Sequence, residues 1–106
     1  MQYSFTAAVV CALLSGIATI AVASTVSVTI SDLAFTPADI DAKVGDTVEW
    51  TNRDYVDHTA TSTDGAWDTD VAAGQSGKVI LTRPGTFGYF CKVHPNMTGT
   101  VHVAPK

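Results

Sequence analysis

The chain has 106 residues, of which 46% are hydrophobic, and its six Lys and Arg against ten Asp and Glu give a formal net charge of −4. This length allows one small domain. The six basic residues are never clustered, which excludes the basic patch that a nucleic-acid-binding surface needs.

The first element in chain order is an apolar run, AAVVCALLSGIATIAVA, over residues 7–23. It ends in Ala-Val-Ala, the small-residue pattern after which signal peptidases cut. We therefore expect residues 1–23 to be a signal peptide and residues 24–106 to be a single domain that is periplasmic, or otherwise exported or at the cell surface. The preceding MQYSFT lacks Lys and Arg, which leaves an uncleaved membrane anchor as the alternative.

Removal of this leader would take Cys11 with it and leave Cys91 as the single cysteine of the remaining 83 residues. An intrachain disulfide is then excluded. Small exported domains bury a modest fraction of their surface, and many depend on a disulfide or a metal ion for stability. The cysteine content therefore points to a metal site.

Short runs of alternating polar and apolar residues follow, and no segment after the leader has a helical period. Turn signals recur about every 8 to 12 residues, which is typical of an antiparallel sandwich. We expect an all-β, Greek-key antiparallel β-sandwich of about seven short strands. These lie at residues 25–30, on both sides of a Val44-Gly45-Asp46 turn within residues 39–52, and at residues 58–63, 74–82, 86–91 and 100–103.

The stretch CKVHPNM, which begins at the last residue of the segment 86–91, places Cys91, His94 and Met97 at steps of three residues. A thiolate, an imidazole and a thioether are soft or borderline ligands that suit copper. A trigonal site of two His and one Cys with a weak axial Met needs one more histidine. His58 can supply it, since it begins a strand after a polar loop. His102 alternates with core-facing residues, and we expect it to face solvent.

His58, followed by Cys91-x-x-His94-Pro95-x-Met97 after GTFGYF, resembles the type 1 blue copper family, the cupredoxins. VGDTVEWTNRD and RPGTFGYFCKVHPNMTGTVHV extend the resemblance over essentially all of the chain after the leader. It implies one type 1 copper cycling between Cu(I) and Cu(II), with His58, Cys91, His94 and Met97 as ligands. It further implies an electron carrier that is not an enzyme and that docks transiently with protein redox partners near His94. A monomer with neither nucleic acid nor a small-molecule substrate is expected.

Two positions depart from the family members with similarly short ligand loops. Thr59 stands where they carry Asn, whose backbone N–H supports the Cys sulfur and whose side chain ties the ligand loops together. The backbone donor is retained, but we expect the side-chain tie to come from another residue. Asn96 stands where they carry an apolar ring, so the surface around His94 is expected to be less hydrophobic.

A periplasmic copper carrier or storage protein with the same ligands is the main alternative. A Cys nucleophile would need an orienting acid or amide and a substrate cleft, which nothing in the pattern indicates. Asp54 and Asp57 are expected to be solvated loop residues. The large aromatic residues are interpreted as core rather than as electron relays, namely Phe35, Trp50, Trp67, Phe87 and Tyr89.

Overall fold

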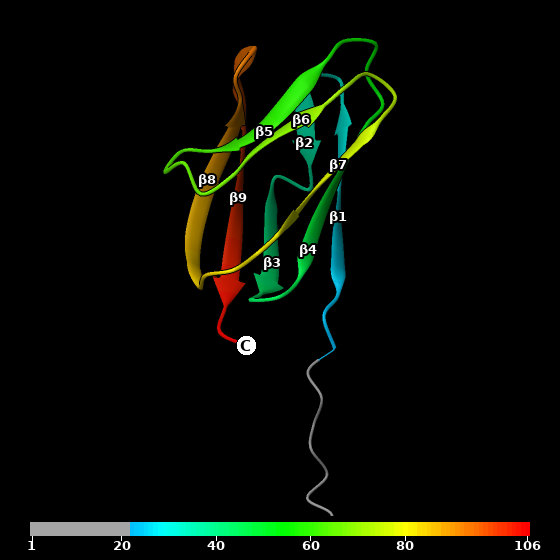
Figure 1. Ribbon diagram of the computed structural model, residues 1–106. Helices are drawn as coiled ribbons and strands as arrows, with labels where there is room; N and C mark the ends of the chain where they lie inside the picture. Colours follow the sequence, from blue (N-terminus) through cyan, green and yellow to red (C-terminus); the bar gives the residue numbers. More distant parts are fainter. Residues whose placement is uncertain (1–21) are drawn as a thin grey trace, which may run out of the picture.

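Two β-sheets lie face to face in the computed structural model, which describes residues 22–106 (Figure 1). Within this part of the chain every regular element is a strand, and no helix is long and apolar enough to cross a membrane. Of the expected signal peptide, residues 1–21 lie outside the described residues. The strands are β1 (Thr25–Ser31), β2 (Ala34–Thr36), β3 (Asp39–Lys43), β4 (Thr47–Asn52), β5 (His58–Ser62), β6 (Asp68–Val71), β7 (Ser76–Ile80), β8 (Gly85–Cys91) and β9 (His94–Ala104).

The sheets have the strand orders β2-β1-β4-β7 and β3-β9-β8-β5-β6. The expected all-β sandwich is thus confirmed. Two pairs within it, β1 with β4 and β3 with β9, are parallel, while the other pairs are antiparallel. The chain passes to the second sheet between β2 and β3 and returns with β4, which therefore lies beside β1 in the same direction.

Each expected strand segment contains a strand, and β2 and β6 are additional. Neither shows a periodic signal, because β2 has three residues and β6, with the sequence DTDV, has one apolar side chain. In β4 the alternation matches burial, because every second residue, Val48, Trp50 and Asn52, is buried.

The core between the sheets is built around an aromatic cluster. The Tyr89 ring lies edge-on to Phe35 and to Trp50, with centroid distances of 4.7 Å and 5.4 Å. Trp67 and Phe87 pack beside it with a centroid distance of 5.6 Å. All five rings are buried, which confirms their interpretation as core residues.

Candidate metal centre

The β8–β9 hairpin forms one end of the sandwich, away from the C-terminus and the start of β1 (Figure 1). Its turn consists of Lys92 and Val93, because Cys91 and His94 are paired across the two strands. The expected last strand, at residues 100–103, is therefore too short, because β9 already begins at His94.

A bulge follows the turn. Consecutive β8 residues pair with His94 and with Thr98, so Pro95, Asn96 and Met97 lie opposite no residue of β8. Proline cannot donate to a strand ladder and is tolerated at bulges, which suits this position. From Met97 onward β9 alternates regularly, so Met97 lies on the same buried side as Val101 and Val103, with 4% of its surface exposed.

Three of the expected ligands come together at this end of the sandwich. The Cys91 Sγ lies 3.6 Å from the His58 Nδ1 and 3.8 Å from the His94 Nδ1, and the three donor atoms all lie within 4.8 Å of one another. Within residues 22–106 they form the one such cluster of three or more His, Cys, Asp or Glu. Cys91 and His58 are buried, whereas His94 is partly exposed. One soft thiolate between two imidazoles suits copper, so the donor set fits the expected ion.

Met97 and His94 line the same surface depression, three residues apart on β9. His102 lies outside the cluster: it is exposed, and its Nδ1 is 3.4 Å from the Thr86 hydroxyl. The expectation that His102 faces solvent is confirmed.

Thr59 supports the Cys91 sulfur and also ties the ligand segments together. Its backbone N–H donates a hydrogen bond to the Cys91 Sγ at 3.3 Å, which fixes the direction of the sulfur. Its side-chain hydroxyl accepts a hydrogen bond from the Lys92 N–H at 2.9 Å. The expectation that this tie comes from another residue is therefore wrong, because a hydroxyl at the same position reaches the turn after Cys91.

The tie belongs to a closed ring of hydrogen bonds whose directions can be assigned. The Thr61 hydroxyl donates to the Asp68 carboxylate at 2.7 Å, which uses its one hydrogen. The Thr61 oxygen must therefore accept a hydrogen bond from the Thr59 hydroxyl, which is 3.0 Å away. The Lys92 ammonium closes the ring on Asp68 at 2.7 Å, and this hydrogen bond lowers the pKa of the Asp68 carboxyl. The ring joins β5, β6 and the β8–β9 turn.

Asp54 orients His58 from the opposite side of the ring. Its Oδ2 lies 2.9 Å from the His58 Nε2, so the other ring nitrogen, Nδ1, faces the Cys91 sulfur. A carboxylate on the far nitrogen fixes the tautomer and direction of a metal-binding imidazole. The Asp54 side chain is 15% exposed, and its interpretation as a solvated loop residue is wrong.

The Asp54 carboxylate also stabilises the turn between β1 and β2. It accepts hydrogen bonds from the Asp32 N–H at 2.8 Å and the Leu33 N–H at 3.0 Å. Both residues have a left-handed backbone, with φ of 54° and 58°, which is uncommon for residues other than glycine. Burial opposes ionisation, but these bonds and the one from His58 hold the pKa of the Asp54 carboxyl below its ordinary value.

Apolar side chains from two segments flank His94 on the surface. Leu33, from the turn held by Asp54, is 51% exposed, and Val93, from the β8–β9 turn, is 60% exposed. With Pro95 and Asn96 they line the depression that contains His94. Apolar surface beside His94 is therefore supplied by residues other than position 96.

A sequence profile described as "Cupredoxin-like domain" matches residues 4–103. Amicyanin from Paracoccus denitrificans is 32% identical over an alignment that covers 72% of this chain and 63% of that relative, so the chain spans less than two thirds of its length. Among solved structures, the reduced state of an amicyanin variant is similar with a TM-score of 0.66 and 29% identity, over 76% of this chain and 82% of that one. The Cu(I) form of another amicyanin variant has the same TM-score and identity over 82% and 88%.

Proposed function

Since the chain belongs to the cupredoxin-like family, we propose that it is a type 1 blue copper protein that carries single electrons between protein redox partners. His58, Cys91, His94 and Met97 are the proposed ligands of one copper ion. The observation that supports this most directly is the meeting of the Cys91 sulfur with two imidazole nitrogens within 4.8 Å. Copper bound there would supply a one-electron couple between Cu(II) and Cu(I).

The protein's part is to hold the donor atoms in one arrangement for both oxidation states. Cys91 and His58 are buried at the ends of packed strands, and the Thr59 N–H fixes the direction of the sulfur. Asp54 fixes the His58 ring, and the Thr59 hydroxyl fixes the turn after Cys91. Little rearrangement between states means a low barrier to moving one electron.

His94 is the proposed point of electron exchange, because it is the partly exposed member of the donor cluster. Leu33 and Val93 offer exposed apolar surface beside it, which supports transient docking of a protein partner at this end of the sandwich. The protein acts as a monomeric carrier and not as an enzyme, without a small-molecule substrate or nucleic acid.

We further propose that residues 1–23 are a signal peptide, that residues 24–106 form the single type 1 copper domain, and that this domain acts in the periplasm or on the outside of the cell. The pattern Ala-Val-Ala before Ser24 supports this. All buried hydrophobic residues of the described chain lie between Val28 and Val103.

A periplasmic copper carrier or storage protein is the second candidate, since the same donors could deliver the ion instead of an electron. Cyclic voltammetry of the copper-loaded protein distinguishes the two functions. An electron carrier should give a reversible one-electron wave and keep its copper through many cycles. Loss of copper to a Cu(I) chelator upon each reduction, without a reversible wave, would favour the copper carrier.

The Met97→Gln variant tests the axial position. We expect it to remain coloured and to have a lower reduction potential, because an amide oxygen favours Cu(II) over Cu(I) more than a thioether does. Voltammetry of the two proteins at one pH measures the difference. An unchanged potential would mean that Met97 is not an axial ligand.

Replacing Asp54 by Ala should lower the copper affinity by about 10- to 100-fold, because the His58 ring loses the carboxylate that orients it. Competition with a chelator of known affinity measures the change. Asp57→Ala is the matched control: Asp57 is on the same loop, but it accepts a hydrogen bond from the Ala73 N–H and makes none to His58. Equal losses in the two variants would show that Asp54 has no specific role.

A further inference from the structure

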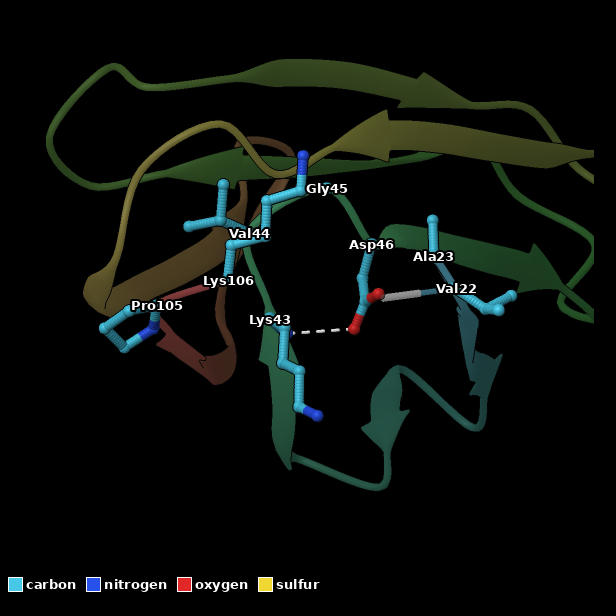
Figure 2. Close-up of a pocket in the computed structure, with 8 residues that line it drawn as sticks. All are labelled: Val22, Ala23, Lys43, Val44, Gly45, Asp46, Pro105 and Lys106. Atoms are coloured by element: carbon cyan, nitrogen blue, oxygen red, sulfur yellow. Dashed lines mark hydrogen bonds between the residues drawn. The ribbon is translucent and has the colours of Figure 1, made fainter. Parts of the chain in front are cut away.

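A buried carboxylate lies at the end of the sandwich opposite the metal centre. Asp46, between the β3–β4 turn and β4, is 7% exposed. Its Oδ1 accepts a hydrogen bond from the Ser24 N–H and its Oδ2 one from the Lys43 N–H, both at 2.9 Å. Figure 2 shows this carboxylate between Lys43 and Ala23. Within residues 22–106 no cationic side chain forms an ion pair with it.

Ser24 is also where the described chain joins the fold. Its carbonyl accepts a hydrogen bond from the Thr47 N–H at 2.9 Å, and β1 begins at the next residue. The two preceding residues, Val22 and Ala23, are exposed, Val22 to 81%. The fold therefore needs the nitrogen of Ser24 but not the side chains just before it.

We infer that Asp46 is the acceptor for the α-ammonium group that Ser24 acquires when a leader peptidase cleaves the chain after Ala23. This inference rests on the leader proposed above and not on the copper site. Water hydrolyses the amide bond between Ala23 and Ser24. The carbonyl carbon leaves as the carboxylate of Ala23, and the nitrogen of Ser24 is protonated to an ammonium group.

The nitrogen that becomes charged is the atom already 2.9 Å from the Asp46 Oδ1. An amide hydrogen bond to a carboxylate thus becomes an ion pair without a change in the path of β1, and such charge-assisted hydrogen bonds are the stronger kind. A chain that begins one residue earlier carries its ammonium group about 3.8 Å further along the backbone. A chain that begins at Thr25 lacks the nitrogen altogether. Asp46 therefore distinguishes one cleavage position from its neighbours.

The pair should exist over a defined pH range. Hydrogen bonds from the Ser24 and Lys43 N–H groups hold the pKa of the Asp46 carboxyl below its ordinary value, and the nearby charge of Lys43 acts in the same direction. Lys106 is the other cationic residue that lines the surface pocket beside Asp46. An α-amino group has an ordinary pKa of about 7.7–8.0, which the carboxylate should raise. The stabilisation is then present at neutral pH and is lost as the pH rises through that raised pKa, or falls through the lowered pKa of Asp46.

Thermal unfolding of three forms of the processed chain tests the inference, each with and without Cu(II). One begins at Ser24, one begins at Ala23, and one begins at Ser24 with an acetylated amino group, which keeps the N–H donor but removes the charge. We expect the free Ser24 form to have the highest midpoint at pH 7. Its advantage should disappear at pH 11 and in an Asp46→Asn background, while N-terminal analysis of the exported protein should find Ser24.

Equal midpoints for the free and acetylated Ser24 forms at pH 7 would overturn the inference. So would an advantage that persists at pH 11, or exported protein that begins at another residue. If the Asp46→Asn variant fails to fold, an NMR titration of the Ser24 α-amino group in the unmodified sequence takes the place of that test. An ordinary pKa of this amino group would contradict the ion pair. The copper spectrum is read on the same samples, so failure at Asp46 and failure of the copper site are distinguishable.

Discussion

We expect the Cys91→Ser variant to lose the intense visible absorption of the copper-loaded protein completely. The absorption requires charge transfer from a thiolate to Cu(II), and a serine hydroxyl at the same position offers only a hard, protonated oxygen. Serine is close to cysteine in size, so the buried position between His58 and Thr59 remains filled.

Visible spectra after addition of one equivalent of Cu(II), with circular dichroism to verify the fold, measure this effect. His102→Ala is the matched control, because His102 is exposed and lies outside the donor cluster. It should keep the full absorption. A folded Cys91→Ser protein that remains blue would contradict the assignment of the sulfur ligand.

A single methyl group added at Gly99 is expected to cost stability. Gly99 pairs with Tyr89 across β8 and β9, and a Cβ atom there would overlap the tyrosine ring, coming within 2.6 Å of its Cε1. The ring is 1% exposed and is packed against Phe35 and Trp50, so it has no free space to move into. We expect Gly99→Ala to lower the free energy of unfolding by about 1–3 kcal/mol, the usual cost of overpacking a core.

Gly88→Ala is the matched control on the neighbouring strand. A Cβ atom at Gly88 would meet the Thr63 hydroxyl at 3.5 Å, an ordinary contact. Thermal unfolding of both variants measures the difference, and each 1 kcal/mol corresponds to about 4–8 °C in a domain of this size. Equal midpoints for the two variants would show that the Tyr89 ring can move aside.

Much of this fold is predictable because several of its strands alternate between the core and solvent. The segments around Trp50 and Tyr89 are examples: each places buried residues at every second position. Strand direction is not encoded in that alternation, so the parallel pairing of β1 with β4 could not be read from it. It depends on which sheet each strand joins, which local sequence does not specify.

The donor set is predictable for a different reason, since Cys91, His94 and Met97 are close in sequence and chemically distinctive. Copper ligation by them stays a prediction, but their residue types and spacing indicate it without any structure. The supporting residues are less visible. Asp54 is a carboxylate four residues before His58, but this spacing alone does not predict their contact. Asp54 also binds the turn between β1 and β2, which is more than twenty residues earlier in the chain and which local sequence does not place beside it.

The most direct test of the central claim is a titration of the metal-free protein with Cu(II), followed by visible spectroscopy. A type 1 site predicts an intense blue absorption that grows linearly and stops at one copper per chain, and that bleaches reversibly upon reduction. Binding of Cu(II) with only a weak, pale absorption, or no saturation at one equivalent, would contradict a site formed by His58, Cys91, His94 and Met97.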